Sequence, residues 1–338
     1  MSTHIPYLDG WRGLAIACLL TGHFFPVAGI NFGTVGVALF FVLSGLLMAR
    51  VLFLQRAEFG AFYRRRIARV FPSVAVYLAA ITCIYLLLGE PVVLAELLPA
   101  MSFTNNYFVT DNWTMPFGHI WSLSVEEHSY VVLSLAAGWS RVRGGRGLSA
   151  MGLVLGLVIL ATGVVSLAPA LAPSNAFLRT EVASFGILFS GFALLAFHYG
   201  GMRPAWRWMA PLMLLIGVAA HWWSVPPGVR VLLGWGALAL ALNTMAHAPR
   251  LILAMFEQAW LRRLGTVSFS LYLWQQPFYQ LVHQRGMPPL LGLALSIAVG
   301  LAAFYLIERP ARTYLNTRWT GKANPAPPAA SDAPALQP

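Results

Sequence analysis

Charged residues are scarce in this sequence. Only 10% of the 338 residues are Asp, Glu, Lys or Arg, against about 25% in a typical soluble domain. The apolar residues make up 58% of the chain and gather in long blocks, and a block of about 20 such residues can cross a bilayer. The composition therefore excludes an ordinary soluble domain. It predicts an all-α, multi-pass integral membrane protein, because a segment in lipid must satisfy its own backbone hydrogen bonds.

Cysteine is nearly absent as well. Cys18 and Cys83 are the two cysteines of the sequence, and both fall inside apolar blocks. There they are best interpreted as small buried hydrophobic residues. We therefore expect neither a disulfide nor a bound metal.

About ten membrane spans are expected from the apolar blocks. Residues 1–312 would form one membrane domain, and residues 313–338 a disordered cytoplasmic tail. The stretch from Gly321 onward is rich in proline and alanine and cannot build a core. The expected spans lie near residues 7–26, 34–54, 71–89, 119–138, 150–170, 181–198, 206–223, 229–246, 266–283 and 289–308.

Acidic residues are few relative to basic ones, with 11 against 22, which gives a net charge of +11. Such an excess can indicate a nucleic-acid partner. Here, however, most arginines fall in alternate loops between the expected spans, and loops with this bias are cytoplasmic. Both termini are therefore expected to be cytoplasmic. The charge then reflects membrane topology, and we expect no nucleic-acid partner.

The first expected span contains three ionisable residues, Asp9, Arg12 and His23. Arg12 and His23 are 11 residues apart, which is close to three helical turns, so they share a face and lie roughly 16 Å apart along the axis. A polar stripe of this kind indicates a protein interior or a wet cavity. Asp9 and Arg12 could instead mark the cytoplasmic helix end. His23 could make a structural hydrogen bond between helices.

The fourth expected span has a second polar stripe. His119, Ser122, Glu126 and Tyr130 share one helical face, and Glu127 is expected to point elsewhere. A carboxylate that faces a histidine can orient its ring and support its action as a base. Glu126 could instead pair with Arg12 or with another cation in the membrane.

Two further segments carry candidate residues. Arg66 and Arg69 lie one turn apart before Pro72; they form either a fork for phosphate groups or part of the topogenic charge. In the second span the small residues Gly33, Gly36, Ser44 and Gly45 favour close helix packing, with direct substrate contact as the alternative.

Six segments in order resemble acyltransferase family 3, a family of membrane proteins that O-acylate sugars and related acceptors. The resemblance runs from Tyr7 to about Arg312, nearly the whole chain. The segments are "LDGWRGLAIACLLTGHF", "GVALFFVLSG", "RRRIARVFP", "HIWSLSVEEHSYV", "VSFSLYLWQQPF" and "LIERPAR".

The resemblance implies an O-acyltransferase in the cytoplasmic membrane of a bacterium. Its donor would be cytoplasmic acyl-CoA, usually acetyl-CoA, with no permanently bound cofactor. Its acceptor would be a hydroxyl on the outer side, most often of a surface polysaccharide or glycan. The match assigns the catalytic role to His23, supported by Arg12, and donor binding to Arg66 and Arg69. Glu126 is expected to take part in catalysis by orienting His23 or the acceptor. The residues expected to contact substrate are Asp9, Ser44, His119, Ser122, Tyr272 and Gln275.

The sequence departs from the family pattern at two positions. Ala38 stands where the family often has aspartate, and Gln275 where it often has histidine, and both changes are expected to alter the acceptor site. Two alternatives are a proton-coupled transporter, which also needs ionisable residues in the membrane, and an acyltransferase-like protein without activity. The sequence does not fix the oligomeric state.

Overall fold

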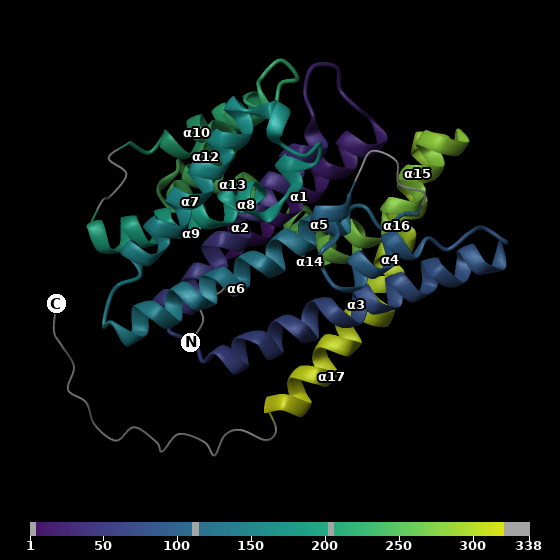
Figure 1. Cartoon of the computed structure of the whole chain (residues 1–338), viewed down its shortest axis with the longest axis horizontal. Coiled ribbons are helices and arrows are strands. Elements are labelled where there is room, and N and C mark those ends of the chain that lie inside the picture. Colours follow the sequence, from purple (N-terminus) through teal and green to yellow (C-terminus); the bar gives the residue numbers. More distant parts are fainter. Residues whose placement is uncertain (1–4, 110–114, 202–205, 321–338) are drawn as a thin grey trace.

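The computed structural model describes residues 5–109, 115–201 and 206–320 (Figure 1). Within these ranges the chain is helical apart from its loops and one isolated antiparallel bridge between Ile30 and Trp222, so the all-α prediction is confirmed. The helices that position the site are α1 (Pro6–Phe24), α2 (Phe32–Ala49), α3 (Phe59–Leu87), α6 (Ile120–Val142), α14 (Ala259–Trp274) and α15 (Gln276–Arg285).

The remaining elements surround these helices. The α-helices are α4 (Leu94–Met101), α5 (Asn105–Phe108), α7 (Leu148–Leu167), α8 (Thr180–Ala183), α9 (Phe185–Gly200), α10 (Met209–Ala219), α11 (Pro227–Val229), α12 (Gly236–Thr244), α13 (Arg250–Phe256), α16 (Pro289–Ala303) and α17 (Arg309–Thr320). The π-helical segments are η1 (Arg50–Leu54), η4 (Arg230–Trp235) and η6 (Phe304–Glu308), and the 3₁₀ turns are η2 (Pro169–Leu171), η3 (Ala176–Leu178) and η5 (Met245–His247).

Six continuous helical segments in the described residues are long and apolar enough to cross a membrane, so the protein is a multi-pass membrane protein. The other four expected spans are different. α1 and α6 carry charged side chains, α10 has only 11 residues, and α14 meets α15 at Gln275. The count of ten spans therefore stays a prediction. The six segments are Phe32–Leu54, Phe59–Leu87, Leu148–Leu167, Thr180–Gly200, Pro227–His247 and Pro289–Trp319.

Two predicted boundaries differ from the structure. The third span was expected from residue 71, but α3 begins at Phe59 and continues through Pro72, which puts Arg66 and Arg69 inside a helix. A membrane helix tolerates proline because neighbouring groups satisfy the freed backbone. At the other end of the chain, α17 continues to Thr320, so residues 313–320 are helical rather than disordered. Residues 321–338 of the expected tail lie outside the described residues.

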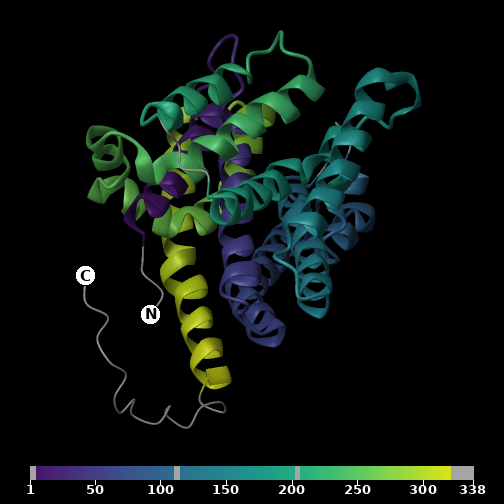
Figure 2. The same cartoon turned by 90° about the vertical axis from the view of Figure 1, so that its left-hand side faces the viewer.

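The helices form two groups on either side of a central set. In Figure 1, α7, α9, α10 and α12 lie on one side and α3, α16 and α17 on the other, and Figure 2 gives the view turned by 90°. α1 packs against both α2 and α14 between these groups. It contributes Trp11 to one apolar cluster and Ile16 and Leu19 to a second. The ionisable residues of α1, Asp9, Arg12 and His23, are accordingly only partly exposed.

Close backbone contacts fix the position of α1 and α2. A methyl group added at any of three glycines would collide with a backbone carbonyl of the neighbouring helix, so the helices approach closely only because no side chain is present. This confirms the packing interpretation of Gly36 and Gly45. The glycines Gly36, Gly45 and Gly265 face the carbonyls of Ala15, Ile187 and Asp9, respectively.

The arginine-rich loops gather at one end of the helices. Arg141 Nη2 donates to the carbonyls of Leu52 and Ala57, both at 2.9 Å, and the Arg146 guanidinium lies over the ring of Tyr199. We call this the arginine end. The α1–α2 loop lies at the opposite end, where the Trp223 backbone N–H donates to the Gly29 carbonyl. The predicted topology requires the arginine-rich loops to lie at the same end of the helices. That the arginine end is cytoplasmic stays a prediction.

Candidate active site

A small chamber of about 80 Å³ lies between α1, α2, α3, α6 and α14. Aliphatic and aromatic side chains form much of its wall, so a charged ligand there would meet side chains rather than bulk water. The structure thus brings together most of the residues predicted for catalysis and donor binding. The polar side chains that line the chamber are Arg12, Ser44, Arg66, Arg69, Ser122, Glu126, Tyr130, Ser268 and Tyr272.

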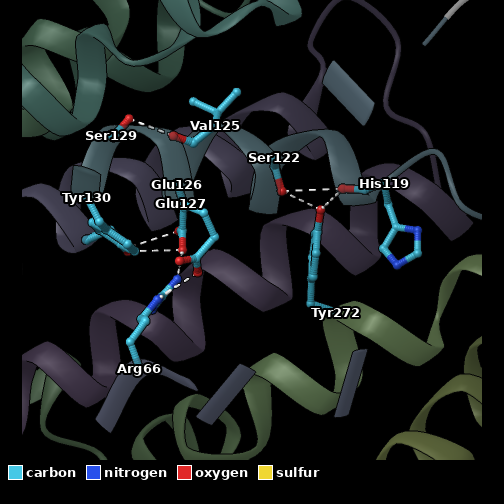
Figure 3. A network of polar contacts seen from close by, with 10 residues as sticks. Arg66, His119, Ser122, Val125, Glu126, Glu127, Ser129, Tyr130 and Tyr272 are labelled. Carbon is cyan, nitrogen blue, oxygen red and sulfur yellow. Dashed lines mark hydrogen bonds and ion pairs between the residues drawn. The ribbon is translucent and has the colours of Figure 1, made fainter. Parts of the chain in front are cut away.

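Arg66 is held by two carboxylates at once (Figure 3). Its Nη2 lies 2.8 Å from Glu126 Oε2 and its Nε 2.9 Å from Glu127 Oε1. The prediction that Glu127 points away from Glu126 is wrong. The two neighbouring side chains converge because a guanidinium offers donors along two of its edges. The ring of Tyr130 covers the Arg66 guanidinium at 4.2 Å.

Glu126 is saturated by partners inside the chamber. Besides Arg66, it accepts hydrogen bonds from Ser44 Oγ at 2.9 Å and from Tyr130 Oη at 3.1 Å. Among the described residues no hydrogen bond joins it to His23, so it does not orient that ring directly. Of the two interpretations of Glu126, pairing with an intramembrane cation describes this structure, and the cation is Arg66 rather than Arg12.

Arg12 makes a different ion pair, within its own helix. Its Nη1 lies 2.7 Å from Asp9 Oδ1, one turn earlier, and both side chains are about one-fifth exposed. Arg12 lines the chamber, whereas Asp9 does not. Asp9 is therefore placed to hold Arg12 rather than to contact a ligand in the chamber.

Arg69 completes the set of cations at the chamber. Among the described residues Arg69 has no hydrogen bond or ion pair. The charges that act on it from farther away are those of Arg12, Arg66 and Glu308. Glu308 was missed by the sequence analysis. It is a buried acid in η6 that accepts a 2.6 Å hydrogen bond from Ser270 Oγ. An acid at the end of an apolar span was the available signal.

His23 lies in a second group of side chains, near the other end of α1. Its Nδ1 is 2.8 Å from Gln275 Oε1. Because Gln275 Nε2 donates to Gln276 Oε1, the amide oxygen of Gln275 is the atom that faces His23, and Nδ1 must carry the proton. Nε2 is then an acceptor, which is the form that a general base needs. The ring of Tyr279 packs on the imidazole with centroids 4.4 Å apart.

Gly33 leaves space beside the His23 ring. A methyl group there would lie 3.4 Å from Nε2 and 3.3 Å from Cδ2. Gly33 thus differs from Gly36 and Gly45, since the atoms nearest to such a methyl group belong to the side chains of Asn31 and His23 rather than to backbone. Gln275, one of the two departures from the family pattern, supplies a hydrogen-bond acceptor to His23. Ala38, the other departure, is fully buried among apolar side chains.

Ser122, Tyr272 and His119 lie where the chamber faces the His23 end. Tyr272 Oη donates to the His119 carbonyl and lies 2.6 Å from Ser122 Oγ (Figure 3). The His119 ring is buried against the rings of Tyr77 and Tyr272. Its two nitrogens lack a hydrogen-bond partner of normal geometry in the described part of the chain.

Comparison with known proteins shows which family the chain belongs to. The family model described as "Acyltransferase domain", that of acyltransferase family 3, matches residues 5–309. The chain belongs to this family. The resemblance inferred from the six sequence segments is confirmed, which favours the enzyme over the transporter alternative. An acyltransferase implies an acyl donor and an acceptor, for which the chamber and the His23 group are the candidate sites.

Curated relatives of this acyltransferase are O-acetyltransferases. The peptidoglycan O-acetyltransferase OatA of Listeria monocytogenes is 25% identical over 359 residues, which is 91% of this chain and 56% of that protein. The O-acetyltransferase OatA of Staphylococcus aureus is 26% identical over 149 residues, which is 39% of this chain and 24% of that protein. The chain thus spans about half the length of the Listeria relative. No solved structure matches it.

Proposed function

We propose that this acyltransferase moves an acyl group, in the simplest case acetyl, from cytoplasmic acyl-CoA to a hydroxyl of a surface glycan. It would work in the cytoplasmic membrane of a bacterium. The observation that carries the proposal is the division of α1, which holds Arg12 at a chamber lined by three arginines and His23 among uncharged side chains farther along the same helix. The relatives named as peptidoglycan O-acetyltransferases support a glycan acceptor.

The donor would enter from the arginine end. Its phosphates need cations, and Arg12, Arg66 and Arg69 supply guanidinium groups at the chamber. The pantetheine arm is narrower than the nucleotide, so the arm is the part of the donor that would enter the chamber between the helices. The nucleotide would then lie toward the arginine end, and the thioester would extend past Ser122 and Tyr272 toward His23.

This geometry changes the role expected for Arg12. Arg12 and His23 are 11 positions apart on one continuous helix, α1, which is roughly 16 Å along the axis. Side chains of a helix lean in the same direction, so one thioester carbonyl cannot contact both Arg12 and His23 Nε2. We therefore assign Arg12 to donor binding rather than to stabilising the oxyanion that forms when the thioester carbonyl is attacked.

His23 would carry out the chemistry through Nε2. It takes the proton of the acceptor hydroxyl while that oxygen bonds to the thioester carbon. The carbon–sulfur bond then breaks, and the sulfur of CoA receives the proton from His23. The same nitrogen could instead accept the acyl group first and pass it on. Gln275 holds the ring in the required tautomer in either route.

Mass spectrometry of envelope glycans tests this function. A strain that lacks the protein is complemented with wild type, with His23→Ala, or with His283→Ala as a matched control, all at equal expression. His283 is an exposed histidine whose Nδ1 lies 2.9 Å from the Tyr279 carbonyl. We expect ester-linked acyl mass to return with wild type and the control only. Equal restoration by His23→Ala would overturn the assignment of His23.

A further inference from the structure

The oxyanion of the transferred acyl group needs a hydrogen-bond donor, since Arg12 is assigned to donor binding. A donor that is fixed before the reaction stabilises the developing charge without having to reorganise. The polar residues where the chamber faces the His23 end are Ser122, Tyr272 and His119. The donor is expected among these three residues, because the thioester would pass them on its way to His23.

The two hydroxyl groups of this set have no proton left for a ligand. Tyr272 Oη donates its proton to the His119 carbonyl. Ser122 Oγ lies 2.6 Å from Tyr272 Oη and 3.4 Å from the same carbonyl, so Ser122 is the donor in either contact. A hydroxyl group has one proton to donate. Both protons are therefore used within these three residues (Figure 3).

The His119 ring, in contrast, has two unused nitrogens. The residue is only 5% exposed, yet neither Nδ1 nor Nε2 has a hydrogen-bond partner in the described part of the chain. The Leu273 carbonyl lies near the ring but outside hydrogen-bond geometry. A buried polar group without a partner is costly, and a neutral imidazole always carries one N–H donor. The unpartnered ring thus indicates a ligand that supplies a hydrogen-bond acceptor.

Aromatic packing and the backbone hold this ring in place. The rings of Tyr77 and Tyr272 lie against it, with centroids 5.3 and 5.4 Å away. Tyr77 Oη donates to the Pro116 carbonyl at 2.6 Å, and Tyr272 Oη donates to the backbone of His119 itself. The imidazole is therefore preorganised, as an oxyanion donor has to be.

His119 and His23 contact neighbouring positions at the end of α14. The Tyr272 ring packs on His119, and Gln275, three residues later, lies 2.8 Å from His23 Nδ1. Residues at this spacing are neighbours on a helix surface. In Figure 3 the His119 ring extends on the side of Tyr272 that is away from Arg66. The ring thus lies at the His23 end and apart from the ion pairs.

We propose that His119 is a catalytic residue, whose ring N–H donates a hydrogen bond to the oxyanion of the transferred acyl group. The inference rests on the proposed transfer from acyl-CoA. When the acceptor hydroxyl attacks the thioester carbon, His23 takes its proton and the electron pair of the carbonyl moves onto oxygen, beside His119. The carbonyl forms again as the carbon–sulfur bond breaks, and His23 returns the proton to sulfur. His119 keeps its own proton throughout.

The kinetics of acyl transfer in membrane vesicles test this role. His119→Phe keeps a flat ring without nitrogen, whereas His119→Gln keeps an N–H donor. We expect kcat to fall about 100-fold in His119→Phe, the size of one lost oxyanion donor, and to recover in part in His119→Gln. KM for the donor should stay unchanged. The control His128→Phe lies on the same helix and removes a histidine whose Nδ1 already has Thr180 as its partner; it should transfer at the wild-type rate.

Infrared spectroscopy of the bound donor gives a readout that a structural role would not move. The full-length protein in lipid nanodiscs receives acetyl-CoA labelled with ¹³C at the carbonyl. A hydrogen bond to this carbonyl lowers its stretching frequency. We expect a lower frequency with wild type and His119→Gln than with His119→Phe, at equal occupancy of the donor site.

The outcomes distinguish a failure of this inference from a failure of the proposed function. Transfer by His119→Phe at half the wild-type rate or more, or equal frequencies in wild type and His119→Phe, would overturn the role of His119 and leave the proposed function standing. Loss of CoA binding by His119→Phe would do the same, because the ring would then hold the fold or the donor. Absence of acyl transfer and of CoA binding in wild type would overturn the proposed function itself.

Discussion

At one end of α1 the guanidinium of Arg12 lies among ion pairs, whereas at the other end His23 has an amide, a phenol ring and a glycine beside it. Charged groups are thus concentrated where an anionic donor would have to be desolvated. The contacts of His23 are with uncharged groups, and a general base acts from its uncharged form. A single helix therefore holds two kinds of polar group, roughly 16 Å apart along its axis.

The largest expected effect comes from removing the base at the neutral end. His23→Gln keeps a polar group near Gln275 but has no ring nitrogen to take a proton. We expect the rate of acyl transfer in membrane vesicles to fall at least 100-fold, within the range that a general base contributes. Retention of half the wild-type rate at equal expression would place the base elsewhere.

The next effect concerns the charged end. Arg66→Met would leave Glu126 and Glu127 buried without their cation, and breaking such a pair typically costs about 3–5 kcal/mol. We expect a clear fall in the thermal unfolding temperature of the purified protein. Arg69→Met is the matched comparison, and it should melt close to wild type because Glu308 keeps Ser270 and Arg312. Equal destabilisation by both substitutions would contradict the difference between the two arginines.

A smaller effect is expected from the hydrogen bond that orients His23. Gln275→Ala removes the acceptor of the Nδ1 proton, so both tautomers of the ring become populated. We expect a fall in kcat of about tenfold, the size of a lost hydrogen bond of about 1.4 kcal/mol, with little change in KM for the donor. Gln280→Ala, at the residue that directly follows Tyr279, serves as the control. A change in KM alone would indicate that Gln275 contacts the donor instead.

The smallest expected effect tests the space beside the ring. Gly33→Ala places a methyl group 3.4 Å from His23 Nε2, so the acceptor hydroxyl would have less room to approach. We expect a loss of a few-fold in transfer rate with normal expression. Gly156→Ala is the control, since a methyl group there meets open space. An unchanged rate would show that the acceptor approaches from another side.

Helical periodicity predicted which side chains share a face but not which helices meet. The alignment of Arg12 with His23 followed from a spacing of 11 residues, and α1 is one unbroken helix. The contact between His23 and Gln275 joins residues 252 positions apart, and that between Ser270 and Glu308 joins different spans. No local pattern encodes such contacts, so these pairs of residues became visible only in the structure.

The third helix shows a second limit of the sequence. Pro72 and the preceding arginines predicted a loop before the span, whereas α3 starts 12 residues earlier than expected. The Arg66 side chain is satisfied by carboxylates from α6, which offsets the cost of placing a charge in the helix bundle. The family segments nevertheless identified both arginines, because their order along the chain does not depend on knowing where the helix begins.

The most direct test of the account is the sidedness of acyl transfer. Inside-out and right-side-out membrane vesicles, prepared from the same expressing cells, would each receive radiolabelled acetyl-CoA on the outside. The account predicts ester-linked label on membrane-bound glycans in inside-out vesicles, where the arginine end faces the donor, and none with His23→Gln. Equal labelling of right-side-out vesicles would contradict the account, in which the donor enters at the arginine end and the acceptor binds at the opposite end of the helices.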